Sequence, residues 1–386
     1  MDYLLTEEQL MLRDLARKIA REKIEPVRAH YDETEEFPWE IVKILAESDL
    51  YALFIPEEYG GLGYGVLELS IAVEELSKVC GGITLCLAAS ALGTFPLLLF
   101  GNEAQKKKYL PSLAKGEKIT GFALTESSAG SDAAAVQTTA VKDKDGYILN
   151  GTKQWITNGG EAQIYTVIAL TDKKKGVRGT SAFIVEKDTP GFTFGKKEKK
   201  LGIRGSTTRE LVFNNCHISQ DNILGKEGMG FIVAMKTFDV SRPGVAAQAL
   251  GIAQGALDEA LSYAHSRIQF GKPISSFQAV GHMLADMSIQ IEAARSLIYS
   301  TCRMIDAGKK NFGKESAACK VFASDTAMKV TVDALQVFGG YGYMKDYPIE
   351  KMMRDAKITQ IYEGTNQIQR NIIAQNLIRE AARKKV

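Results

Sequence analysis

The stretch YEGTNQIQR, near the end of the chain, places a carboxylate directly before a glycine. Apolar residues surround Glu363 in sequence, at Ile358, Ile361 and Ile368. Burial among such residues would raise the pKa of the Glu363 carboxyl group, which suits a general base. Gly364 would let a ligand carbonyl approach the backbone N–H groups closely. The same pattern also fits an acid that only caps a helix.

Two other segments could meet a flat or charged cofactor. Trp155 and Thr157 lie two residues apart in a strand-like pattern, so they should share one face of a sheet. An indole beside a hydroxyl could flank a planar ring, although a tryptophan of the core would give the same pattern. The stretch GFALTESSAGSD, residues 121–132, could offer backbone N–H groups to a phosphate, or it could be an ordinary polar loop.

Arginines suggest where an anion could bind. FDVSRP places Asp239 and Arg242 before a helix, an arrangement that suits a polar ligand and equally suits ordinary capping. Arg267, in RIQFGKPISSFQ, could pair with a phosphate or form a surface salt bridge.

Composition excludes several classes of function. The chain has 386 residues, with 48 Lys and Arg against 46 Asp and Glu, so a nucleic-acid partner is not expected. Five cysteines without C-x-x-C and four scattered histidines predict neither a disulfide framework nor a metal site. The glycine clusters miss the G-x-G-x-x-G spacing, and the chain has no Walker A motif. The acidic N-terminus lacks a secretion signal, and we expect no apolar run to reach the roughly 18 residues needed to span a bilayer, so a cytoplasmic protein is expected.

The spacing of apolar residues changes twice along the chain and so divides it into three segments. Residues 1–118 and 227–386 repeat apolar residues every three to four positions, whereas residues 119–226 contain strand patterns such as QIYTVIAL and SAFIVE. Asn150-Gly151 is a strong signal for a hairpin turn. We therefore expect an α+β, mainly α, protein with domains at these boundaries: an N-terminal helical domain, a central antiparallel β domain and a C-terminal four-helix bundle.

Taken in order, these segments resemble the acyl-CoA dehydrogenase family over essentially the whole chain. The matching pieces are FALTESSAGSD, QWITNGG, LGIRGSTTRELVF, RIQFGKPISSFQ, DALQVFGGYGY and MRDAKITQIYEGTNQIQR. The likeness is closest to short-chain, butyryl-CoA-type members. It implies an FAD enzyme that oxidises an acyl-CoA thioester to its trans-2-enoyl-CoA, with Glu363 at the position of the catalytic base.

The resemblance also implies roles for individual residues. Those that would line the isoalloxazine ring of FAD are Phe122, Leu124, Thr125, Trp155 and Thr157. Those that would reach the FAD of a neighbouring subunit are Arg267, Phe270, Gln278 and the stretch from Gln336 to Gly340, while Thr365 and Gln367 would also contact FAD. Ser131 would lie near the FAD pyrophosphate and CoA, Asp239, Ser241 and Arg242 would hold CoA, and Gly364 would give the thioester room.

The family passes electrons to electron-transferring flavoprotein and forms homotetramers, so the resemblance implies both. Some members carry the base where this chain has Ser241, which cannot serve as one, and this favours Glu363. Ser127 replaces the proline that usually follows Thr-Glu. An oxygen-using acyl-CoA oxidase and a non-catalytic acyl-CoA-binding protein remain the alternatives.

The acyl group is less constrained by the sequence. The helix in GITLCLAASALG is expected to form part of the pocket for the acyl tail, as it does in the family. Its small Ala88, Ala89 and Ala91 could leave room for a longer, branched or cyclic chain, or they could pack against neighbouring helices. A short straight chain is the first expectation, and a branched or cyclic one the second.

Overall fold

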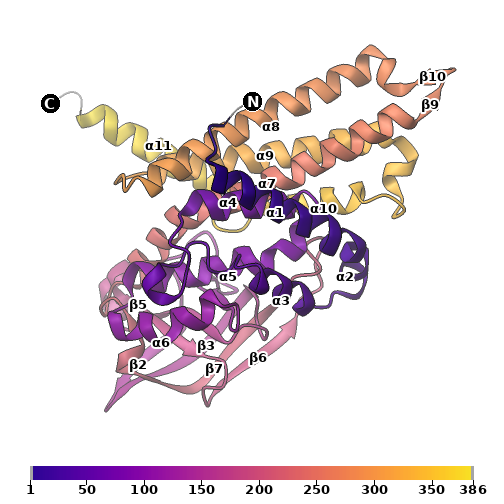
Figure 1. Cartoon of the computed structure of the whole chain (residues 1–386). Coiled ribbons are helices and arrows are strands. Elements are labelled where there is room, and N and C mark those ends of the chain that lie inside the picture. The colour runs from indigo at the N-terminus through magenta and orange to yellow at the C-terminus, as the bar shows by residue number, and fades with distance from the viewer. Residues whose placement is uncertain (1–2, 384–386) are drawn as a thin grey trace.

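The computed structural model describes residues 3–383. Helices, a β-sheet and a second group of longer helices follow one another along the chain (Figure 1). In Figure 1 the sheet lies at one end of the molecule, the long C-terminal helices lie at the other, and the N-terminal helices lie between them. The expected mainly helical α+β fold is confirmed, whereas the domain limits at residues 118 and 226 stay predictions.

The N-terminal helices surround one strongly apolar helix, α5. Helix α1 begins with the capping box, in which the Thr6 hydroxyl accepts from the Gln9 N–H and the Gln9 side chain accepts from the Thr6 N–H. Helix α4 packs against both α1 and α5. The helices of this part are α1 (Glu7–Ile19), α2 (Arg28–Thr34), α3 (Trp39–Glu47), α4 (Val66–Ser77), α5 (Gly81–Phe100) and α6 (Glu103–Ala114), with short helical turns at Ala20–Ile24, Glu25–Val27 and Glu57–Tyr59.

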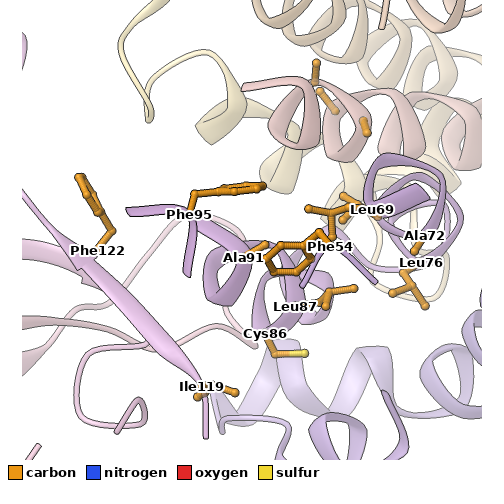
Figure 2. Packing of buried hydrophobic residues seen from close by; sticks show 14 of the residues in the cluster. Phe54, Leu69, Ala72, Leu76, Cys86, Leu87, Ala91, Phe95, Ile119 and Phe122 are labelled. Carbon is orange, nitrogen blue, oxygen red and sulfur yellow. The ribbon is translucent and has the colours of Figure 1, made fainter. Parts of the chain in front are cut away.

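Helix α5 corrects one expectation from the sequence. Gly81–Phe100 is long and apolar enough to cross a membrane by length and composition alone, so the prediction that no run reaches this length was wrong. Of its apolar window, 72% is buried inside the protein, which is typical of a core helix. Figure 2 shows Leu69 and Leu76 of α4 and Phe95 of α5 among the packed side chains, with Phe122 of the first strand beyond them.

The central sheet is mainly but not wholly antiparallel. Strand β1 pairs in parallel with β4, and β2 meets β4 in parallel at one position. A parallel pair needs a long connection, and the β2–β3 hairpin lies between β1 and β4 in the chain. The strands are β1 (Thr120–Ala123), β2 (Thr139–Asp143), β3 (Gly146–Thr157), β4 (Ile164–Leu170), β5 (Thr180–Glu186), β6 (Phe192–Lys197), β7 (Thr208–Ser219) and β8 (Ile223–Leu224), in the order β6-β7-β3-β2-β4-β5-β8 with β1 beside β4.

The hairpin turn expected at Asn150-Gly151 was wrong. Strand β3 runs through both residues, and the turn lies earlier, because Asp143 pairs with Gly146 across the β2–β3 hairpin. At Gly151 the pairing of β3 with β7 shifts in register, as in a β-bulge. A Cβ there would lie 2.7 Å from the Thr138 Cα, so the glycine permits a close approach of two backbones.

The C-terminal helices pack along one another over much of their length. Helix α7 packs along α9 and α8, and both α10 and α11 pack against α9. Alanines on α7, such as Ala249, Ala253 and Ala256, are completely buried and allow this close approach. The helices are α7 (Gly230–Ser266), α8 (Gln278–Asp306), α9 (Gly313–Phe338), α10 (Ile349–Thr359) and α11 (Asn366–Arg383), and the small hairpin of β9 (Ile268–Gln269) and β10 (Lys272–Pro273) extends from the end of α7 (Figure 1).

Candidate active site

The turn between α10 and α11 presents Glu363. Its backbone is left-handed, with φ of 49° at Glu363 and 90° at Gly364. The Gln369 side chain donates hydrogen bonds of 2.9 Å to the carbonyl oxygens of both residues. Arg242 of α7 donates through Nε to the Glu363 carbonyl oxygen at 3.4 Å. These contacts hold a backbone conformation that costs energy at a non-glycine residue, and such strain is often found at functional sites.

The carboxyl group of Glu363 is desolvated. Part of the residue is accessible from a cavity, but protein encloses the carboxyl group, and this burial raises the pKa of Glu363. A hydrogen bond of 2.6 Å from the Ser241 hydroxyl to Oε2 and the positive charges of Arg242 and Lys320 act in the opposite direction. A carboxylate with these surroundings can accept a proton from a ligand in the cavity.

The cavity beside Glu363 has a volume of about 120 Å³. Its walls are mostly apolar and come from α4, α5, the sheet and α7. The three alanines Ala88, Ala89 and Ala91 all line it. Other lining residues are Leu69, Val73, Leu85, Leu92, Phe95, Ile156, Phe238, Gly244, Val245, Gln248 and Tyr362.

Segments that are far apart in sequence meet at this cavity. The residues expected there that line it are Phe122, Leu124, Thr125, Trp155, Thr157, Ser241 and Glu363. Trp155 is 55% exposed and therefore is not a core tryptophan. Its φ of 58° lies where the pairing of β3 with β7 shifts in register between Lys153 and Ile156.

A buried ion pair behind the cavity holds the loop after β1. The Lys153 ammonium donates to the Leu124 carbonyl oxygen at 2.9 Å and to Glu126 at 2.7 Å. Glu126 also accepts from the backbone N–H groups of Gln137 and Thr138. Burial lowers the pKa of Lys153 to about 8, although Glu126 raises it. The sequence analysis did not identify this pair, which fixes a loop beside the cavity.

The side chains around Trp155 fit the edge of a flavin ring. Among residues 3–383, neither the Thr125 nor the Thr157 hydroxyl has a hydrogen-bond partner. Both hydroxyls border the cavity next to the exposed indole of Trp155. A planar, polar-edged ring would find a flat apolar surface and two free hydroxyls there.

Other predicted residues do not line the cavity beside Glu363. Arg267 and Gly340 line a separate cavity of about 500 Å³ at the far end of α7 and α9, together with Tyr263 and Tyr341. Phe270, in the β9–β10 turn, is 93% exposed. Residues that line neither of these two cavities are Ser131, Gln278, Gln336, Thr365 and Gln367, of which the last two border a third cavity of about 290 Å³.

Two of the residues that are expected to bind CoA, Ser241 and Arg242, also contact the candidate base. Ser241 donates to the Glu363 carboxylate, and Arg242 donates both to the Glu363 carbonyl oxygen and, at 3.3 Å, to Asp239. The Arg242 side chain is buried, and Asp239 is partly exposed. The structure thus brings Ser241 and Arg242 to the base, and no sequence motif indicated these contacts.

Comparison with known proteins agrees with this arrangement. Three family models match in order: "Acyl-CoA dehydrogenase, N-terminal domain" over residues 6–117, "middle domain" over 121–216 and "C-terminal domain" over 228–378. The solved butyryl-CoA dehydrogenase of Megasphaera elsdenii is 48% identical, with a TM-score of 0.96 over 98% of this chain and all of that one. A structure described under "Electron transferring flavoprotein of Acidaminococcus fermentans" is 51% identical, with a TM-score of 0.96 over 98% of this chain and all of that one.

A third solved structure adds the cofactor. An acyl-CoA dehydrogenase of Bacillus anthracis complexed with FAD is 34% identical, with a TM-score of 0.93 over 99% of this chain and 68% of that one. The family models together cover nearly the whole chain. This chain therefore belongs to the acyl-CoA dehydrogenase family and is an FAD-dependent enzyme that oxidises acyl-CoA thioesters.

Proposed function

We propose that Glu363 is the base that removes the α-proton of a short, straight-chain acyl-CoA. The observation that carries this proposal is a desolvated carboxylate at the edge of a small apolar cavity, which is also lined by Thr125, Trp155 and Thr157. Burial makes the carboxylate a stronger proton acceptor than a solvated glutamate. Ser241 and Arg242 orient it through the hydrogen bonds to its carboxylate and to its carbonyl oxygen.

Backbone groups beside Glu363 would stabilise the charge that develops on the thioester oxygen. The Glu363 N–H has no acceptor within the part of the chain that the structure describes. Gly364 leaves space beside it because it has no side chain. A fixed N–H donor in a water-poor site stabilises a developing enolate oxygen. FAD, when bound, supplies the acceptor for the β-hydrogen, and Thr125, Trp155 and Thr157 are the residues that would hold its ring.

The hydrogen-bonded lining of the cavity and its small size support a short acyl chain. The Tyr362 hydroxyl donates to the Gln248 side chain, which in turn donates to the Gly81 carbonyl oxygen at 2.7 Å. The hydrogen bond between Tyr362 and Gln248 holds both side chains in the wall of the cavity and so limits its size. The volume of about 120 Å³ is also well below the ~300–1,000 Å³ typical of pockets for drug-sized ligands. A butyryl group, as in the name of the Megasphaera elsdenii relative, fits these limits better than a cyclic or branched chain.

We further propose that reduced enzyme passes its electrons to an electron-transferring flavoprotein in the cytoplasm. The 51% identical structure that is described under "Electron transferring flavoprotein of Acidaminococcus fermentans" supports this choice of partner. We also propose a homotetramer. Arg267 and Gly340 line a separate cavity and Phe270 is exposed, which supports a homotetramer because these residues could then complete the FAD site of a neighbouring subunit. Several roles stay predictions: FAD binding for Phe122, Leu124, Gln278, Gln336, Thr365 and Gln367, and CoA binding for Ser131, Asp239, Ser241 and Arg242.

Substitution of the base tests the proposal. Glu363→Gln should keep the flavin absorbance and the binding of acyl-CoA but lose nearly all turnover, because an amide cannot accept the proton. Substantial remaining activity would show that another residue is the base. Measuring turnover with a dye or flavoprotein acceptor and with oxygen separates a dehydrogenase from an oxidase, and a screen of acyl-CoA esters tests the preference for a short chain.

A further inference from the structure

Lys320 of α9 lies directly against the turn that carries the base. Its side chain is fully buried, with 0% of its surface exposed. The ammonium donates to the Gly364 carbonyl oxygen at 2.8 Å and to the Asn366 side-chain oxygen at 2.9 Å. Both acceptors are neutral. Burial of an ammonium group without a carboxylate at hydrogen-bond distance is costly, which suggests that the lysine has a role besides packing.

Helix α9 holds the end of the turn at several points. Besides the bond to Lys320, the Asn366 side chain donates to the Ser324 hydroxyl at 2.9 Å and to Asp325 at 2.8 Å. Asn366 is the first residue of α11, so these contacts fix where that helix begins. They also fix the orientation of the two left-handed residues that precede it.

Lys320 and Glu363 affect each other's charge. Burial lowers the pKa of Lys320 to about 7, and the negative charge of Glu363 raises it. Burial likewise raises the pKa of Glu363, and the Ser241 hydrogen bond and the charges of Arg242 and Lys320 lower it. Other titratable groups lie near these two residues. Three of them are carboxylates in ion pairs: Asp239 of α7 with Arg242, Asp325 of α9 with Arg370 of α11, and Asp355 of α10 with Lys351. The remaining two are Cys319 of α9 and Tyr362 of the turn itself.

We propose that Lys320 is a positioning residue for the base: its ammonium holds the Glu363-Gly364 turn through Gly364 and Asn366 and supplies a positive charge that keeps the Glu363 carboxylate ionised. This inference rests on the proposed role of Glu363. The positive charge lies on the backbone side of the turn, so it can act on Glu363 without occupying the substrate cavity, which Lys320 does not line.

The variant Lys320→Met removes the charge and both hydrogen bonds but keeps a long side chain. Lys329→Met is the matched control, because Lys329 lies on the same helix with its side chain exposed. The measurements are bound flavin, KM for butyryl-CoA, and kcat from acid to alkaline pH. We expect Lys320→Met to keep flavin and KM, to lose kcat at neutral pH by roughly tenfold or more, and to shift the acid limb of the kcat profile to higher pH. The control should match the unmodified enzyme.

Lys320→Gln separates the charge from the hydrogen bonding, because an amide can donate but is neutral. The proposal expects Lys320→Gln to shift the acid limb in the same direction as Lys320→Met, and Lys320→Arg to shift it less. An unchanged profile in a folded, flavin-loaded Lys320→Met enzyme overturns the proposal, as does a loss of kcat that is equal at every pH. If Lys320→Met fails to bind flavin, the profile of Lys320→Gln decides by the same criteria.

The Glu363→Gln enzyme, assayed in the same series, tests the base separately. Full turnover in Glu363→Gln overturns both assignments. An inactive Glu363→Gln enzyme together with an unchanged Lys320 series overturns only the role of Lys320.

Discussion

The Ser241 hydroxyl lies 2.6 Å from Oε2 of Glu363, although 122 positions separate the two residues in the chain. The bond joins the first third of α7 to the turn before α11, and both residues line the cavity between α5, α7 and the sheet. A side chain that cannot itself be a base thus holds the carboxylate of the proposed base. The packing of α7 against α10 brings these two segments together.

Removal of this hydroxyl should slow the reaction without abolishing it. In Ser241→Ala the carboxylate loses a bond worth about 1.5–3 kcal/mol, as is typical for a hydrogen bond to a charged group. We expect kcat at neutral pH to fall roughly tenfold, with little change in bound flavin. Because the Ser241 bond lowers the pKa of Glu363, the kcat profile should also shift to higher pH. A full pH series of steady-state rates checks both effects, and an unchanged profile would contradict this role.

The unmodified enzyme should lose activity as the pH falls, and it should do so above the ordinary glutamate pKa of 4.5. If Glu363 is the base, as we propose, it accepts the substrate proton only when it is ionised, and burial raises its pKa. Activity is therefore present above the raised pKa and is lost as the pH decreases through it. The pH dependence of kcat/KM in the free enzyme measures this limb. A limb at or below 4.5 would argue against a desolvated base.

Gly364→Ala should damage catalysis more than stability. The residue has φ of +90°, and a Cβ there would lie 2.5 Å from the Gln369 side-chain nitrogen that holds the turn. Displacement of Gln369 would move Glu363, and a shift of about 1 Å can reduce turnover about 100-fold. Gly281→Ala is a suitable control, since a Cβ at that site has nothing within 4 Å. Steady-state kinetics and thermal unfolding of both variants make the comparison.

The Lys153–Glu126 pair should be important for stability. Lys153→Met leaves the Glu126 carboxylate buried without its partner, which typically costs about 3–5 kcal/mol in the free energy of unfolding. The second substitution Glu126→Gln should restore part of this loss, because the unpaired charge is then removed. Denaturant unfolding of the single and double variants gives the values. Equal destabilisation by the single and the double change would contradict an uncompensated charge as the cause.

Gln248 should limit the length of the acyl chain. Gln248→Ala removes part of the cavity lining. The ratio of kcat/KM for hexanoyl-CoA to kcat/KM for butyryl-CoA should therefore rise roughly tenfold, a typical effect of one or two methylene groups. Tyr362→Phe removes the hydroxyl that binds Gln248 but keeps the ring, so it should shift the preference in the same direction by a smaller factor. Rates over a series of straight-chain esters test this. A preference that stays at four carbons in Gln248→Ala would place the limit elsewhere.

The sequence predicted the features that depend on local pattern. The helical periods of α5, α7 and α8 and the β-branched strands β4 and β5 lie where expected. The cavity residues from Phe122 to Thr157 were expected only through the family resemblance, since their own pattern also fitted a core or a loop. The hairpin turn at Asn150-Gly151 was mispredicted because the residue types of a tight turn also suit a β-bulge. The close contact of Gly151 with Thr138 decides between the two, and this contact is not local in sequence.

Contacts between segments that are distant in the chain could not be predicted from the sequence. Lys320 and Gln248 lie on ordinary helical stretches, and only the packing of α7 and α9 against the last turn shows what they contact. Ser241 was expected to hold CoA, and its bond to Glu363 depends on the crossing of helices rather than on any motif. Charge and composition could not indicate these pairings, because a buried lysine and a surface lysine look alike in sequence.

Helix α5 serves two purposes at once: one of its sides fills the hydrophobic interior, and another forms a wall of the cavity beside Glu363, which we propose holds the acyl chain. A larger residue at Ala88, Ala89 or Ala91 would therefore alter substrate choice and interior packing together. Adaptation of this enzyme to a new chain length is consequently easier through residues that border the cavity from α7, such as Gln248 or Val245, than through the helix on which the rest of the fold is assembled.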